Sequence, residues 1–137
     1  MNKIMALDIG KKRIGVALSD FLHILAKPYQ VVQRVPQEEA IKTIKQIAEE
    51  NKVKTIVVGV PYNMDGTIGT QANDCIEFSS LLKNDFVIVY EDERLTSFEA
   101  EENLKLAGKS YTKNKGLVDM ESACIILEQY LNRKDKQ

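Results

Sequence analysis

The stretch IMALDIGKKRIGVALSD, near the amino terminus, constrains the fold more than any other part of the chain. Residues 3–9 form one apolar run, and in residues 13–19 large apolar side chains alternate with small ones, as in a β-strand. The link GKK between the runs is short enough for a hairpin. The chain is therefore predicted to begin with two antiparallel strands, and Asp8 lies near the end of the first.

The rest of the chain shows a strand and helix pattern typical of an α/β sheet. The strands are predicted over residues 3–9, 13–19, 29–34, 55–60 and 86–92. The helices are predicted to begin near Pro36 and to cover residues 67–83, 97–107 and 119–133. The last two strands are continuously apolar, as in strands covered on both faces. This order predicts a mixed sheet, with an antiparallel meander at one side and parallel strands at the other.

Length and composition indicate one soluble domain spanning residues 1–137. A chain of 137 residues can bury an ordinary core without disulfides or metals. No run approaches the roughly 18 apolar residues of a membrane span, and no signal peptide is evident, so we expect no membrane contact and a cytoplasmic location. Cys75 and Cys124 lack CxxC spacing and are expected to be reduced core residues. The net charge of −1 argues against nucleic-acid binding through bulk charge alone.

Acidic residues stand where strands end and where the last helix is expected to begin. Asp8 shares a strand face with Ile4 and Ala6, and it lies at the carboxyl end of a predicted central strand. The run Glu91-Asp92-Glu93 ends a predicted parallel strand, so it should reach the same edge of the sheet. Asp119 is in line with the apolar residues of the last helix, so it should face inward. Ionised carboxylates gathered there need cations, and Mg²⁺ or Mn²⁺ suits oxygen ligands.

Each acidic residue also has a simpler interpretation. Taken alone, Asp119 is better explained as the N-cap of the last helix, a position where Asp is strongly preferred. Glu91 fits a solvated charge at a strand end, and Asp8 alone could face solvent or bind a basic neighbour. His23, the single histidine, is read as a loop or surface residue and receives no role. Only the convergence of several carboxylates favours a metal site.

Two loops could hold phosphate near these acids. VGVPYNMDGTIGTQA leads from a strand end to a helix start, where free backbone N–H groups can bind anions, although it has no P-loop GK[ST] motif. GKSYTKNKG carries lysines around Tyr111 and could close over a nucleic-acid backbone. An ordinary turn is the alternative for the first loop.

Four motifs in order, LDIGKKRIGVALSD, VGVPYNMDGTIGTQA, YEDERLTS and VDMESACIILEQYL, resemble the YqgF (RuvX) family of proposed pre-16S ribosomal RNA nucleases, which is related to the Holliday junction resolvases. The match spans nearly the whole chain. The resemblance implies an RNase H-like fold, with a mixed five-stranded sheet flanked by helices. It also implies a metal-dependent nuclease that processes the 5′ end of small-subunit ribosomal RNA precursors.

Carried over by position, the resemblance gives Asp8, Glu93 and Asp119 as the catalytic, metal-binding acids. Asp8 would bridge two Mg²⁺ or Mn²⁺ ions, and the other two would each complete one coordination shell. Asp92 could exchange roles with Glu93, since strand alternation turns only one of them toward the metals. Asp20 resembles a family position near the site. The residues expected to contact nucleic acid are Lys11, Lys12, Arg13, Arg94 and Lys113.

Three other functions remain open from the sequence. The first is a resolvase that cuts four-way DNA junctions. The second is a phosphate-binding hairpin of the kind found in actin-like ATPases, although 137 residues supply only one of the two domains that those proteins need. The third is a non-catalytic ribosome-assembly factor that binds nucleic acid, with the ribosomal subunit as its partner.

Overall fold

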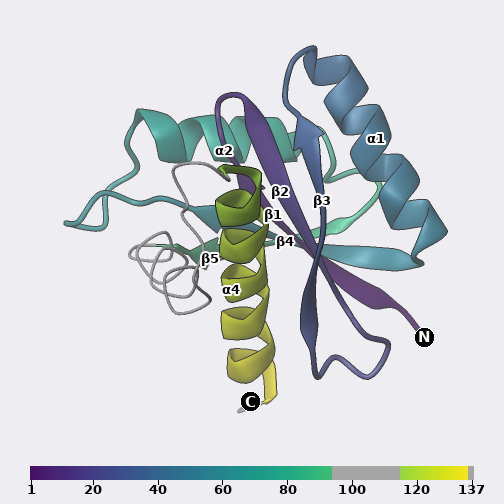
Figure 1. Ribbon diagram of the computed structural model, residues 1–137. Coiled ribbons are helices and arrows are strands. Elements are labelled where there is room, and N and C mark those ends of the chain that lie inside the picture. The colour runs from purple at the N-terminus through teal and green to yellow at the C-terminus, as the bar shows by residue number, and fades with distance from the viewer. Residues whose placement is uncertain (94–114, 136–137) are drawn as a thin grey trace.

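Strands β1 (Lys3–Ile9) and β2 (Arg13–Ser19) form the predicted hairpin in the computed structural model, which describes residues 1–93 and 115–135 (Figure 1). The two strands run antiparallel, and Asp8 lies opposite Gly15. The Gly10 N–H donates a hydrogen bond of 2.9 Å to the Arg13 carbonyl and closes the turn.

Three more strands extend the hairpin on both sides. β3 (Ala26–Gln33) pairs antiparallel with β2, while β4 (Val53–Val60) and β5 (Val87–Asp92) add parallel strands beyond β1. The sheet has five strands in the order β3-β2-β1-β4-β5. The predicted mixed sheet is confirmed, and β1 lies at its centre.

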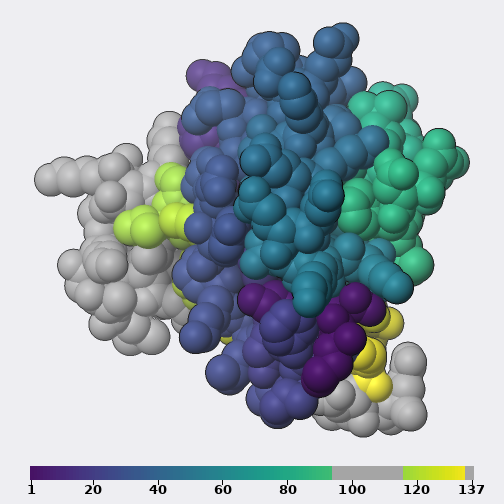
Figure 2. All heavy atoms as spheres, turned by 90° about the vertical axis from the view of Figure 1, so that its right-hand side faces the viewer, coloured from purple at the N-terminus to yellow at the C-terminus, as the bar shows by residue number. Residues whose placement is uncertain are grey.

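Helices cover both faces of the sheet (Figure 1). α1 (Gln37–Glu50) and α2 (Thr70–Ser80) pack on one face, and Figure 2 looks onto the side that carries α1. α4 (Lys115–Asp135) packs on the opposite face, mainly over β1, β2 and β3. The helix predicted over 97–107 lies outside the described residues.

The alternation of side chains on β1 divides the interior into two cores. Met5 and Leu7 pack toward α1 and α2, whereas Ile4 and Ala6 pack toward α4. Each large apolar side chain buried in this way contributes about 1.5–3 kcal/mol to folding. Asp8 continues the series of Ile4 and Ala6, so its carboxylate is on the α4 face of the sheet.

Element boundaries differ from the prediction where polar contacts or proline obscure the pattern. β3 begins at Ala26 because Pro28, which cannot donate to a ladder, is tolerated on an edge strand. α2 begins at Thr70 because the Asp65 carboxylate accepts hydrogen bonds from the backbone N–H and hydroxyl of Thr67 and forms a turn instead.

Strand β5 does not have the two-sided coverage predicted for it. β4 is buried over most of its length, as expected, but Val87 of β5 is 61% exposed and Tyr90 is 41% exposed. β5 is an edge strand, so its continuous apolar run does not mark a central position.

The two cysteines and the long helix agree with the expectations for a buried interior. Cys75 and Cys124 are buried free thiols. None of the helices in residues 1–93 and 115–135 is long and apolar enough to cross a membrane.

Candidate active site

The carboxyl ends of β1 and β5 bring Asp8 and Glu93 together. The Glu93 N–H donates to the Val60 carbonyl at 3.1 Å, so the pairing of β5 with β4 continues one residue beyond the strand. This places Glu93 on the α4 face of the sheet, the same face as Val89. There its carboxyl group shares a hydrogen bond with Asp8, while Asp92 is exposed.

Burial and mutual repulsion raise the pKa of both carboxyl groups. Burial raises the pKa of Asp8 to about 6, and the nearby charge of Asp119 acts in the same direction. Burial and then the charge of Asp8 raise the pKa of Glu93 to about 9. The pair therefore retains a proton at neutral pH, which the two carboxyl groups share.

These pKa shifts predict that the protein loses stability as the pH rises. Both carboxyl groups bind protons more tightly in the folded than in the unfolded chain, whose pKa values are 3.8 and 4.5. The folded state binds more protons between those values and about 9, so the free energy of unfolding should fall across this range. Thermal melts at pH 5, 7 and 9 in EDTA measure how steeply stability falls as the pH rises. Asp8→Asn should flatten this dependence, and an equally steep slope in that variant would contradict the assignment.

Asp119 approaches the pair from helix α4. It is the fifth residue of α4, so its alternative interpretation as the N-cap of the helix is wrong. The Arg13 Nε donates to one Asp119 carboxylate oxygen at 2.8 Å. Three predicted site residues, Asp8, Glu93 and Asp119, thus lie in one region, but only the first two are in direct contact.

Gly15 is a site-forming residue that the sequence analysis did not identify. A Cβ atom there would lie 2.1 Å from the backbone oxygen of Asp119, so α4 rests directly on β2 at this point. Gly15 is also the partner of Asp8 across the hairpin. Its lack of a side chain lets α4 bring Asp119 close to Asp8. A glycine inside a strand pattern was the available signal, because it often marks a close backbone approach.

Gly59 of β4, the strand on the other side of Asp8, also makes room for a neighbouring site residue by its lack of a side chain. A Cβ atom there would lie 2.5 Å from a carboxyl oxygen of Glu93 and 2.4 Å from the Ile126 δ-methyl. The β4 backbone therefore leaves room for both the Glu93 side chain and the packing of α4.

The donor set fits a hard divalent cation in part. Asp8 and Glu93 offer adjacent carboxylate oxygens that share a proton, and a cation such as Mg²⁺ or Mn²⁺ can displace that proton. Within the described residues, however, no group of three or more His, Cys, Asp or Glu side chains is positioned to hold a metal ion. Asp119 already has one carboxylate oxygen engaged by Arg13 in this arrangement.

The basic residues predicted to contact nucleic acid are placed differently from one another. Lys11 and Lys12 are exposed in the β1–β2 turn, while Arg13 is partly buried and bound to Asp119. Arg94 and Lys113 lie outside the described residues, as does nearly all of the loop GKSYTKNKG.

The expectation that Asp20 is near the site is wrong. β2 runs antiparallel to β1, so Asp20 follows the end of β2 that lies beside the beginning of β1, far along the strand from Asp8. The Asp20 carboxylate accepts hydrogen bonds from the backbone N–H groups of Ile24 and Leu25, and these lower its pKa. Asp20 shapes the β2–β3 turn.

Glu91 is not the solvated strand-end charge that its position suggested. It is 8% exposed and forms an ion pair with Arg133 in the last turn of α4. Glu91 shares the α4 face of β5 with Val89 and Glu93, which explains its burial. The contact ties the carboxyl-terminal part of α4 to the sheet.

The mixed five-stranded sheet with helices on both faces defines a protein of the RNase H-like fold class. The chain belongs to the RuvX family, whose model is described as Holliday junction resolvase and matches residues 2–133. This confirms the family predicted from the four motifs.

Curated relatives and solved structures agree with this membership. A protein of Gloeothece citriformis named "Putative pre-16S rRNA nuclease" is 42% identical over 95% of this chain and 87% of its own length. A protein of the same name from Clostridioides difficile is 42% identical over 96% and 95%. RuvC of T. thermophilus in complex with a Holliday junction covers 98% of this chain and 96% of its own, with a TM-score of 0.56 and 11% identity. The fowlpox virus resolvase with junction DNA covers 96% and 98%, with a TM-score of 0.59 and 11% identity. The solved structures confirm the RNase H-like fold.

Proposed function

We propose that this chain, acting as one domain over residues 1–137, is a metal-dependent nuclease that hydrolyses phosphodiester bonds. Its substrate is the 5′ end of the small-subunit ribosomal RNA precursor. The contact between Asp8 and Glu93 carries the proposal, because two partly buried carboxyl groups held together cost folding free energy that a purely structural site would avoid. The name that the curated relatives carry, pre-16S rRNA nuclease, supports the choice of substrate.

Asp8 and Glu93 would hold Mg²⁺ or Mn²⁺, and Asp119 would join them. Such an ion, when bound, supplies a more acidic water and neutralises charge on the phosphate. Arg13 would pair with a substrate phosphate close to the reacting one. Lys11 and Lys12, exposed at the adjacent turn, would attract the flanking backbone, so binding should weaken as salt rises.

The proposal includes a place of action. A ribosomal RNA precursor is met on the assembling ribosomal subunit, so we propose that subunit as a partner and the cytoplasm as the compartment. Four-way DNA junctions are the second candidate substrate, favoured by the description of the family model.

The test compares the wild-type protein with Asp8→Asn on two substrates. A labelled RNA containing the 5′ precursor segment and a synthetic four-way DNA junction are each incubated with Mg²⁺ or Mn²⁺ and with EDTA. We expect RNA cleavage that is lost in the variant and in EDTA. Cutting of the junction alone would replace the RNA substrate by DNA. Intact substrates in every arm would leave a nucleic-acid-binding assembly factor as the function.

A further inference from the structure

A cavity of about 490 Å³ opens on the side of the hairpin turn that faces α1 and α2, and we call it the Arg34 cavity. It is formed by the β1–β2 turn, the link from β3 to α1 and the first turn of α2. Its lining residues are Lys11, Arg34, Val35, Gln37, Thr70, Gln71 and Asp74. The volume is within the range of small-ligand pockets and is ample for a phosphate group with part of its nucleotide.

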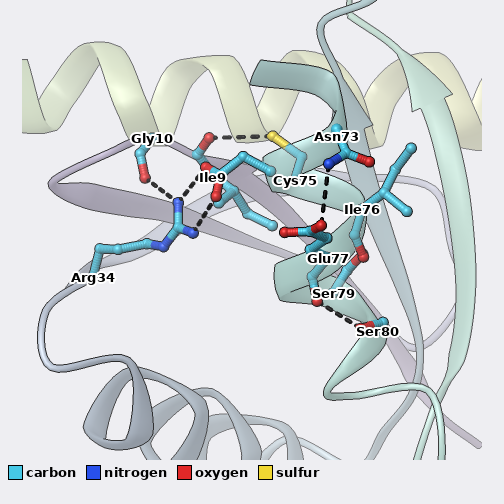
Figure 3. Close-up of polar contacts among 10 residues, drawn as sticks. Ile9, Gly10, Arg34, Asn73, Cys75, Ile76, Glu77, Ser79 and Ser80 are labelled. Atoms are coloured by element: carbon cyan, nitrogen blue, oxygen red, sulfur yellow. Dashed lines mark hydrogen bonds and ion pairs between the residues drawn. The ribbon is translucent and has the colours of Figure 1, made fainter. Parts of the chain in front are cut away.

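Arg34 forms the fixed wall of this cavity. Its guanidinium donates to the Gly10 carbonyl at 2.9 Å (Figure 3). It also donates to both carboxylate oxygens of Asp74 at 2.8 Å, and it stacks on the Phe78 ring. The Arg34 side chain is 11% exposed. Beside it, the Cys75 thiol contacts the Ile9 carbonyl, so α2 is anchored to the hairpin at two points (Figure 3).

The charges around the cavity leave it positive. Arg34 and Asp74 neutralise each other as a bidentate pair. Lys11 adds a further positive charge. The hydrogen bonds and charge of Arg34 and the charge of Lys11 all lower the pKa of Asp74. Glu38 and Glu39, in the first turn of α1, are exposed and are not lining residues.

Backbone donors add to this charge. Gln37 is the first residue of α1, and Thr70 and Gln71 are the first two of α2. Pro36 and Gly69 precede these helices, and in neither case does a side chain of the described residues accept a hydrogen bond as a cap. The N–H groups of two first turns are therefore available near the same cavity, where they favour an anion.

We propose that the Arg34 cavity binds a phosphate group of the nucleic-acid strand that is cut at Asp8 and Glu93. This subsite rests on the proposed nuclease function and specifies how the strand is held. Lys11 follows Asp8 by three residues, a backbone reach of at most about 11 Å, so a strand that crosses the hairpin turn would extend from the acidic pair on the α4 face to the cavity on the opposite face. The Gln37 and Gln71 amides and the Thr70 hydroxyl supply further polar contacts.

Gln71→Glu tests the subsite without threatening the fold. A carboxylate in the first turn of α2 interacts favourably with the helix dipole, but it would repel a phosphate in the cavity. Gln30→Glu is the matched control, because Gln30 is exposed on β3 and is not a lining residue. Binding of a 3′-labelled RNA oligonucleotide is measured by fluorescence anisotropy in EDTA, with and without a 5′-phosphate.

We expect Gln71→Glu to weaken binding about ten-fold, and Gln30→Glu to bind like the wild type. If the weakening requires the 5′-phosphate, the cavity takes a strand end; if it does not, the cavity takes an internal phosphodiester. Inorganic phosphate should shift the backbone amide resonances of Thr70 and residue 71 in the wild type and not in Gln71→Glu. Equal affinities of the two variants, or unmoved amides, would overturn the subsite.

Failure of the phosphate subsite and failure of the nuclease function would give different results. A wild-type protein that cuts nothing but discriminates between the two variants in binding would retain the subsite and lose the catalytic function. A protein that cuts RNA with the same KM in both variants would retain the catalytic function and lose the subsite.

Discussion

Glu93→Gln should reduce phosphodiester cleavage by about 10²- to 10³-fold, the usual effect of removing one preorganised charged group from an active site. Asp92→Asn, the matched control at the preceding residue, should leave the rate close to that of the wild type. The difference is expected because the Glu93 carboxyl contacts Asp8 on the α4 face, whereas Asp92 is exposed. Initial rates on the preferred substrate in Mg²⁺ measure both variants.

The same variant should gain stability while it loses activity. Glu93→Gln removes a carboxyl group that burial forces to hold its proton well above its ordinary pKa, so its melting temperature at pH 8 in EDTA should exceed that of the wild type. A structural role for Glu93 predicts the opposite, a loss of activity together with a lower melting temperature. Equal losses of activity in Glu93→Gln and Asp92→Asn would show that the strand end, and not the Glu93 carboxyl group, matters.

Gly15→Ala should lower the free energy of unfolding by about 2–3 kcal/mol, a typical cost of overpacking. The added methyl group would lie 2.1 Å from the Asp119 backbone oxygen, so α4 must move away from β2. That movement would also withdraw Asp119 from Asp8, and cleavage should fall with stability. Urea denaturation with an unchanged m-value measures the loss.

Gly116→Ala is the control for this effect. Among the residues that the structure describes, a methyl group on Gly116 of α4 would meet only the Val31 Cγ2, at 3.4 Å, which is near ordinary contact. Alanine favours a helix over glycine by up to about 1 kcal/mol, so this variant should be as stable as the wild type or more stable. Comparable destabilisation by both alanines would contradict the close approach of α4 at Gly15.

The central part of the fold could be predicted because local patterns determine it. Alternation in residues 13–19 and the short GKK link were enough to predict the hairpin. The face shared by Ile4, Ala6 and Asp8 follows from strand geometry alone. Alternation also required that Asp92 and Glu93 point to opposite faces. Which of the two contacts Asp8 depends on the pairing of β5 with β4, and no local pattern specifies that pairing.

The wrong predictions have different causes. The position of Asp20 already follows from the predicted antiparallel hairpin, and only the motif resemblance placed it near the site. The burial of Glu91 was missed because it depends on the packing of α4, whose Arg133 is 42 residues away in the sequence. The Arg34 cavity was missed for the same reason, since its walls come from three separate segments. The motif resemblance supplied the proposed catalytic roles of Glu93 and Asp119, which residue patterns alone had left open.

The division of β1 between two cores has a consequence for how this chain can change. Substitution of one aliphatic residue for another along Lys3–Leu7 preserves which side chains meet which helices. A single-residue insertion or deletion in the same stretch would exchange the two sets, and it would turn the carboxylate at the strand's end toward the wrong side of the molecule. The spacing of this strand is therefore under tighter constraint than the identity of its apolar residues.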